Sequence, residues 1–336
     1  MQTGSLISCF VLLVSMVLAR ACPQPEALLY YVPEEAGWDS LQVNARQISI
    51  LAPQVFAVDA AGQVTGAVEE RVRLLAMQHG LRLMPLLVNE NFSPEIAHRV
   101  LSDPQFRRQV IAESVRLCQQ NGCWGLQLDF ERVLAEDKEN YTQFVREAAL
   151  AFQGIQLRFS VAVPSPLWED AQPPGPTQPS FGGYAVVPVP YDLPEIAQQV
   201  DFLTLMTYDQ HSRETAPGPV AGYRWVEQSV RYALQFVPPQ KLSLGMAFYA
   251  RHWCNDVVSE TSYREAARLA RDRGIPLNWH PLHRTPWFEF DGSGCRQVAW
   301  LENRRSLREK LKLVRQYRLL GFSAWRLGQE DPAFWE

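Results

Sequence analysis

Polar and apolar side chains alternate along residues 125–131. Gln127, Asp129 and Glu131 occupy every second position, so in a β-strand they project from one face. Polar groups on an enclosed face are costly unless they form a satisfied or functional network. Two carboxyl groups on one face raise the pKa of one of them, as a general acid working near neutrality requires. The pattern indicates acid–base chemistry, with Glu131 as the proton donor at the carboxyl end of the strand.

The same carboxylates could instead lie on the surface and pair with Arg132. The ends of other strand-like segments favour the catalytic interpretation, because they carry aromatic residues and a further carboxylate. The residues at these ends are Met206, Tyr208, Asp209, Tyr249 and Trp325. Aromatic faces stack on sugar rings and carboxylates bind hydroxyl and amide groups, so this composition is typical of a carbohydrate-binding cleft.

Short apolar segments alternate with amphipathic segments along the whole chain, as expected for repeated β–α units around a parallel sheet. The eight strand candidates are residues 27–31, 54–58, 81–88, 125–130, 157–163, 202–207, 242–248 and 321–325. The helix candidates include residues 69–79, 103–119, 140–152, 225–236 and 307–318. Eight such units in 336 residues predict an α/β fold, the (β/α)8 TIM barrel, whose catalytic groups lie at the carboxyl ends of the strands.

One connection between the predicted strands is far longer than the others. Residues 251–301 contain a helix candidate at 262–273 and strand-like stretches at 286–290 and 297–300. They predict a small α+β insertion between strands seven and eight that forms one wall of a cleft. The proline-rich segment 164–179 follows strand five, and we interpret it as a loop that either contacts substrate or is simply exposed.

The first residues have the features of a targeting segment. The apolar stretch within residues 6–19 is short for a bilayer span, and Ala19-Arg20-Ala21 fits a small-x-small cleavage site. We therefore expect a signal peptide at residues 1–21, a mature barrel domain at residues 22–336, and a secreted, periplasmic or cell-envelope location. Lipid anchoring at Cys22 is a weaker alternative, and a buried N-terminal strand or helix is another.

Composition and motifs exclude several other classes of protein. The net charge of −4 argues against a nucleic-acid-binding protein, which needs clustered lysine and arginine. No segment beyond the N-terminus is long and apolar enough to span a membrane. The sequence lacks a Walker loop, a dinucleotide-binding fingerprint and a nucleophile elbow. We expect a monomer without cofactor or metal.

Four cysteines of the mature chain form two candidate pairs. Cys118 and Cys123 are close in sequence, and Cys254 and Cys295 flank much of the predicted insertion. An exported protein permits disulfides, although sequence does not fix their connectivity, and free buried thiols are the alternative. His280 and His283 with Cys254 or Cys295 could form a zinc site, but we favour a disulfide.

Four separated motifs resemble those of the family 18 glycoside hydrolases. The strand-four motif of that family is Asp-Gly-x-Asp-x-Asp-x-Glu, and this chain has Trp-Gly-Leu-Gln-Leu-Asp-Phe-Glu at residues 124–131. Met-Thr-Tyr-Asp at residues 206–209, Leu-Gly-Met-Ala-Phe-Tyr at residues 244–249 and Ala-Trp at residues 324–325 follow in the family's order. The segments at residues 140–144, 262–266 and 300–306 look like the bacterial spore-germination and peptidoglycan-directed branch.

The resemblance implies substrate-assisted, retaining hydrolysis at an N-acetylglucosamine residue of peptidoglycan or a chitin-like polymer, an exception to the two-carboxylate scheme. Glu131 would protonate the glycosidic oxygen while the 2-acetamido carbonyl of the substrate attacks the anomeric carbon. Asp129 would orient the acetamido nitrogen, and Tyr208 would hydrogen-bond the acetamido oxygen. The substrate-binding residues that the resemblance implies are Gln127, Met206, Asp209, Tyr249 and Trp325.

The motif at residues 124–131 departs from the family's pattern at two positions. Trp124 and Gln127 replace the first two aspartates. In the family the second aspartate helps to cycle the proton of the third, so the neutral amide should alter the pH dependence, although it can still hydrogen-bond Asp129. A non-catalytic, chitinase-like carbohydrate-binding protein is the alternative, against which the retained Glu131 argues.

Overall fold

The computed structural model describes residues 24–169, 178–255, 257–292 and 294–336. The predicted signal peptide, Cys22 and part of the proline-rich segment lie outside these residues. Within the described ranges, no helix is both long enough and apolar enough to cross a membrane.

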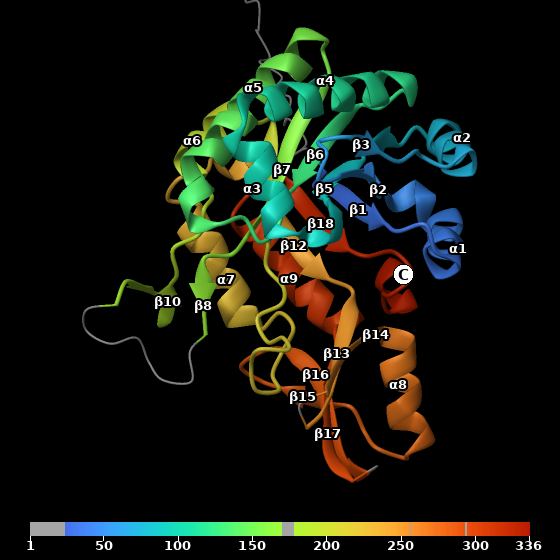
Figure 1. Ribbon diagram of the computed structural model, residues 1–336. Helices are drawn as coiled ribbons and strands as arrows, with labels where there is room; N and C mark the ends of the chain where they lie inside the picture. The colour runs from blue at the N-terminus through green and yellow to red at the C-terminus, as the bar shows by residue number, and fades with distance from the viewer. Residues whose placement is uncertain (1–23, 170–177, 256, 293) are drawn as a thin grey trace, which may run out of the picture.

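Eight parallel strands form a closed barrel, which confirms the predicted fold class (Figure 1). Their order around the barrel is β1, β18, β12, β11, β7, β6, β5 and β2, and β1 also pairs with β2 to close it. The barrel strands are β1 (Glu26–Tyr31), β2 (Ile50–Val58), β5 (Leu86–Asn89), β6 (Gly125–Asp129), β7 (Arg158–Pro164), β11 (Phe202–Met206), β12 (Leu242–Ala247) and β18 (Gly321–Trp325). The short strands β3 (Val64–Thr65) and β4 (Arg82–Leu83) pair with β2 at its edges.

Helices surround the barrel, and each predicted helix is present within a few residues of its expected ends. The helices around the barrel are α2 (Glu70–His79), α4 (Pro104–Gln120), α5 (Lys138–Gly154), α7 (Tyr223–Ala233) and α9 (Arg304–Gln316), and α8 (Tyr263–Asp272) lies in the insertion. In the described ranges, three further α-helices were not among the predicted ones: α1 (Glu35–Asn44), α3 (Pro94–Ser102) and α6 (Leu193–Gln199). The starts of α3 and α6 nevertheless carry a local signal, because each has an N-cap side chain, Ser93 or Asp192, and a proline in its first turn.

The barrel interior contains a layer of small polar side chains beneath the mouth. Thr204 bonds Ser323 at 2.9 Å, and Ser243 bonds the same hydroxyl at 2.7 Å. These residues are buried on strands β11, β18 and β12, and each hydroxyl has a partner. The layer therefore accommodates polar groups inside the barrel without leaving them unsatisfied.

The long connection between β12 and β18 folds as the predicted α+β insertion, seen at the bottom of Figure 1. Its antiparallel sheet has the order β14, β13, β17, β16, β15, and helix α8 packs against β13 and β14. The strands are β13 (Tyr249–Cys254), β14 (Val257–Ser262), β15 (Asn278–His280), β16 (Thr285–Gly292) and β17 (Cys295–Trp300). The first strand begins at Tyr249, so a residue of the barrel mouth is also the first residue of the insertion sheet.

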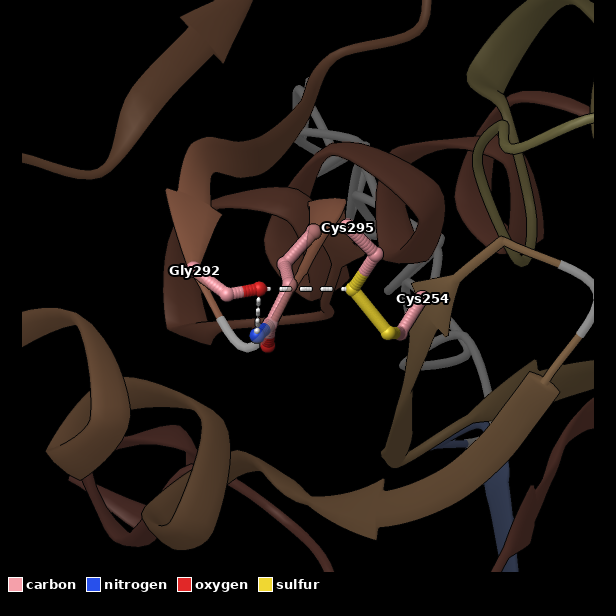
Figure 2. Close-up of a disulfide and its surroundings, with 4 residues drawn as sticks. Cys254, Gly292 and Cys295 are labelled. Atoms are coloured by element: carbon pink, nitrogen blue, oxygen red, sulfur yellow. Dashed lines mark hydrogen bonds between the residues drawn. A yellow bond between two sulfur atoms is a disulfide. The ribbon is translucent and has the colours of Figure 1, made fainter.

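A disulfide joins Cys254 at the end of β13 to Cys295 at the start of β17 (Figure 2). The two Cα atoms are 5.6 Å apart. Cys118 and Cys123 are buried free thiols, so a bridge between them is wrong. The zinc alternative is also wrong, because both cysteines that it needed belong to the disulfide.

Three short strands accompany the predicted proline-rich loop, one within residues 164–179 and two after it. Strand β8 (Leu167–Trp168) pairs with β10 (Tyr184–Val186), which pairs in turn with β9 (Ser180–Phe181). The indole nitrogen of Trp225 donates to the carbonyl of Leu167 at 2.9 Å. This bond anchors the small sheet to helix α7, beside the mouth of the barrel.

Candidate active site

Strand β6 places its side chains as the alternation predicted. Leu126 and Leu128 belong to the large apolar cluster shared with the helices, whereas Gln127 bonds residues of the barrel interior. The strand ends at Asp129, and Glu131 lies two residues beyond it. Gln127 and Asp129 are buried, and Glu131 is partly exposed.

Gln127 is held by protein groups instead of facing the cleft. Its Oε1 accepts from the Tyr30 hydroxyl at 2.7 Å, and its Nε2 donates to Ser160 at 2.9 Å and Thr204 at 3.2 Å. Its side chain is wholly enclosed. Both amide hydrogens are used, so the bond from Gln127 to Asp129 that the sequence allowed is not formed, and the predicted direct substrate contact by Gln127 is contradicted by its burial.

Asp129 is a buried carboxyl group with an available acceptor. Among the described residues, its Oδ1 has no hydrogen-bond partner. Burial raises the pKa of Asp129 well above its usual value, and the nearby Glu131 raises it further. An unpaired buried oxygen is costly unless it serves a function, such as accepting from a ligand N–H.

Glu131 has the electrostatic properties of a proton donor. Burial raises the pKa of its carboxyl group to about 7, and repulsion from Asp209 contributes. Because the pKa values of Asp129 and Glu131 are both raised, the pair retains a proton near neutral pH. A general acid works best with a pKa near the operating pH.

Asp209 is tied to two residues of the insertion. Its Oδ1 accepts from the Tyr249 hydroxyl and from Nη2 of Arg251, the latter at 2.6 Å. Arg251 also donates to the carbonyl of His211 at 2.9 Å. Asp209 has a φ of 62° in the left-handed region, which aspartate tolerates better than most residues. These contacts fix the carboxylate at the rim of the cavity that Glu131 also lines.

The predicted residues other than Gln127 surround one cavity of about 180 Å³ at the barrel mouth. Its lining residues are Tyr30, Phe92, Asp129, Glu131, Ala162, Met206, Tyr208, Asp209, Tyr249, Glu260 and Trp325. Tyr208 is half-buried, and burial raises the pKa of its hydroxyl well above the usual value, so the phenol remains a hydrogen-bond donor. Trp325 lies beside Tyr30, with ring centroids 5.5 Å apart.

A second cavity of about 180 Å³ continues the first toward the proline-rich segment. The two cavities share Glu131, Met206, Tyr208 and Asp209. The second cavity adds Pro164, Ser165, Leu167, Trp168, Gln210 and Trp225. The mouth of the barrel is therefore a cleft in two parts, with Glu131 and Asp209 where they meet.

Sequence reasoning did not single out several residues of this cleft, among them Tyr30, Phe92, Trp168 and Glu260. Tyr30 falls at an inward position of the first strand, so the period of two could have found it. Phe92, Trp168 and Glu260 come from a turn, the small sheet and strand β14, and no local pattern marks them. In the part of the chain that is described, no cluster of three or more His, Cys, Asp or Glu could hold a metal ion.

The arrangement can donate a proton from Glu131 and bind an amide group. Asp129 offers an acceptor for an N–H, Tyr208 offers a donor for a carbonyl oxygen, and Trp325 offers an aromatic face. Aromatic faces and convergent polar groups are characteristic of sites for small polar ligands such as sugars.

Comparisons with known proteins agree with this architecture. The uncharacterized glycosylase YvbX of Bacillus subtilis (strain 168) is 23% identical over 316 residues, covering 91% of this chain and 88% of that protein. The cortical fragment-lytic enzyme of the same organism is 26% identical, covering 88% of this chain and 69% of that protein. The crystal structure of a chitinase from Chromobacterium violaceum ATCC 12472 superposes with a TM-score of 0.81 at 26% identity, covering 93% of this chain and 96% of that one.

The same fold occurs in the spore cortex-lytic enzyme SleL of Bacillus cereus, with a TM-score of 0.80 at 23% identity, covering 93% of this chain and 73% of that one. The family model described as glycosyl hydrolases family 18 matches residues 51–330. This match includes seven of the eight barrel strands, the Asp129–Glu131 pair and the whole insertion. The chain therefore belongs to the glycosyl hydrolases of family 18, and it is a glycosidase.

Proposed function

We propose that this protein is an exported enzyme that cleaves β-1,4 linkages at N-acetylglucosamine residues of peptidoglycan or chitin-like polymers, by substrate-assisted catalysis with retention. The observation that carries the proposal is the pair formed by Asp129 and Glu131 at one cavity. Asp129 has a buried oxygen without a partner, and the pKa of Glu131 is about 7. The relatives named as a chitinase and as a cortical fragment-lytic enzyme support a glycan substrate.

In the first step, protonated Glu131 donates its proton to the glycosidic oxygen as the bond from that oxygen to the anomeric carbon breaks. The carbonyl oxygen of the substrate's 2-acetamido group forms a bond to the anomeric carbon, so the enzyme supplies no nucleophile. Asp129 accepts a hydrogen bond from the acetamido N–H as positive charge develops on that group. The Tyr208 hydroxyl donates to the acetamido oxygen and aligns it for attack.

In the second step, ionised Glu131 takes a proton from water, and the water oxygen attacks the anomeric carbon. The bond between the anomeric carbon and the acetamido oxygen breaks as the water oxygen attacks, which restores the N-acetyl group, and the proton taken from water leaves Glu131 protonated for the next cycle. Two displacements at the same carbon give net retention of configuration. Trp325 would form an apolar floor for the sugar ring, and Asp209 would bind its hydroxyl groups at the rim.

Gln127, which replaces an aspartate of the family motif, has an uncharged structural role in this scheme. The amide is satisfied by Tyr30, Ser160 and Thr204 and makes no bond to Asp129. Position 127 therefore does not exchange a proton with Asp129, which leaves the proton shared within the Asp129–Glu131 pair. The expected consequence is a changed pH profile instead of loss of activity.

One comparison tests the proposal against the non-catalytic alternative. Release of products from N-acetylglucosamine oligomers and from peptidoglycan is measured for the wild type and for Glu131→Gln, and binding of the same sugars is measured in parallel. We expect the wild type to release products and Glu131→Gln to bind without releasing them. A wild type as inert as the variant, with binding retained in both, would establish a carbohydrate-binding protein instead.

A further inference from the structure

Glu131 lies two residues past the end of strand β6, where the residue pairing between β5 and β6 has ended. The last residue pair between β5 and β6 joins Val88 to Asp129. Within the described residues, no hydrogen bond from another side chain holds the Glu131 carboxyl group. The direction of that carboxyl group must therefore follow from how the backbone of Glu131 is held.

The side chain of Asn89 holds this backbone from both sides. Its Oδ1 accepts from the backbone N–H of Glu131 at 3.0 Å, and its Nδ2 donates to the backbone carbonyl of Glu131 at 3.1 Å. Asn89 is fully buried, so water does not compete for these bonds. The amide acts as an additional peptide group and continues the β5–β6 ladder past the point where the strands separate.

The same amide also holds the turn that supplies Phe92 to the cleft. Nδ2 of Asn89 donates to the carbonyl of Ser93 at 2.9 Å. Between them, Asn91 and Phe92 have φ angles of 53° and 50°, a left-handed conformation that needs support from its surroundings. Phe92 and Glu131 line the same cavity. One side chain thus joins the proton donor to an aromatic residue of the same cavity.

We propose that Asn89 is a positioning residue for catalysis, which fixes the backbone of Glu131 and the turn of Phe92 in one geometry. This inference rests on the proposed role of Glu131 as the proton donor. No close substitute reproduces the contacts: aspartate lacks the Nδ2 donor for the two carbonyl groups, and alanine lacks both donor and acceptor.

Several ionisable groups face Glu131 and influence the pKa of its carboxyl group, so a change at position 89 can be detected through that pKa. They come from strands β1 and β6 and from the segments after β10 and β11. They are Tyr30, Asp129, Tyr191, Tyr208 and Asp209. Asn89 adds no charge to this group, so an aspartate there would introduce a new one beside the Glu131 backbone.

The test compares Asn89→Ala and Asn89→Asp with the wild type and with Asn44→Ala. Asn44 is a buried asparagine on α1 whose Nδ2 bonds the Ser40 carbonyl at 2.9 Å, away from the cleft. Measured quantities are kcat and KM on a chito-oligosaccharide, the alkaline limb of kcat/KM, and thermal unfolding. The titration of the Glu131 carboxyl group is followed separately by carbon NMR.

For Asn89→Ala we expect kcat to fall about tenfold to hundredfold, with little change in KM, because a misplaced catalytic group costs rate more than binding. Its alkaline limb and the Glu131 titration should move to lower pH, since a loosened carboxyl group is better hydrated. In Asn89→Asp both should move to higher pH, because a second negative charge disfavours ionisation of Glu131. Asn44→Ala should keep the wild-type kcat and pH profile.

Wild-type kcat and unshifted Glu131 titration in both Asn89 variants would overturn the inference. It would also be overturned if their lost activity matched the unfolded fraction and the folded fraction titrated as the wild type does. A wild type that cleaves no sugar polymer would instead overturn the proposed function. The NMR titration would then still decide whether Asn89 controls the surroundings of Glu131.

Discussion

The Tyr30 hydroxyl donates to Oε1 of Gln127 across 2.7 Å, a bond that links strands β1 and β6 inside the barrel. With Ser160 and Thr204 accepting both amide hydrogens, the amide at position 127 has no donor left for Asp129. The residue that departs from the family motif is thus part of the structural layer beneath the catalytic pair. A substitution of Gln127 should therefore act mainly on the free energy of unfolding.

Gln127→Leu should lower the free energy of unfolding by about 1–3 kcal/mol, because the buried Tyr30 hydroxyl loses its acceptor, and Ser160 and Thr204 each lose the amide donor. Chemical denaturation measures this change. Tyr30→Phe removes only one of the three bonds and should cost less. A Gln127→Leu protein that unfolds at the same denaturant concentration as the wild type would show that the network contributes nothing.

The pH profile of kcat/KM should fall on its alkaline side near pH 7, because Glu131 must be protonated to act and its pKa is about 7. Asp209→Asn removes a like charge, so the pKa of Glu131 should decrease and the alkaline limb should move to lower pH. Glu260→Gln is the matched control, since Glu260 lines the same cavity but does not shift Glu131. Equal shifts in both variants would contradict the assigned cause.

Asp129→Asn should abolish efficient turnover but stabilise the folded protein at neutral and alkaline pH. The folded state raises the pKa of Asp129, so at a pH above the unfolded value of about 3.9 the unfolded chain releases a proton that the folded protein retains. The resulting loss of wild-type stability grows as the pH rises toward the pKa of Asp129 in the folded protein. It vanishes below the pKa of Asp129 in the unfolded chain. Thermal unfolding at pH 4 and pH 8 measures it. A gain that is the same at both pH values would contradict the explanation.

Cys254→Ser combined with Cys295→Ser should lower stability by up to about 4 kcal/mol, the chain-entropy value for a loop closed across 41 residues. The loss should appear as earlier unfolding of the insertion sheet, because the bridge joins its strands β13 and β17. Reduction of the wild type should reproduce the double variant. Unchanged hydrogen exchange in β13 and β17 after reduction would contradict this role.

The barrel could be predicted from sequence because its strands and most of its helices carry local periodic signals. Strand β18 matches its predicted range of residues 321–325, and β6 differs by one residue. The helix α6 was missed because its seven residues are too few for a clear period of 3.6. The small sheet β8–β10 was missed because proline-rich composition conceals strands of two or three residues.

The candidate site could be predicted where its residues lie at or just beyond the ends of strands. Asp129, Glu131, Tyr208, Asp209 and Trp325 lie at or just beyond strand ends, and all line the cavity. Hydrogen-bond partners were beyond reach, because they depend on neighbouring strands that are distant in sequence. Gln127 illustrates this, since its partners Tyr30 and Thr204 are 97 and 77 residues away.

The most direct test of the central claim, that Glu131 protonates the leaving group, varies the leaving group itself. Rates for Glu131→Gln and the wild type are compared on a chito-oligosaccharide and on a dinitrophenyl glycoside of the same sugar, whose leaving group needs no proton. We predict a loss of about 10²–10⁴-fold on the oligosaccharide and a far smaller loss on the dinitrophenyl substrate. Equal losses on both substrates, or no loss on either, would contradict the claim.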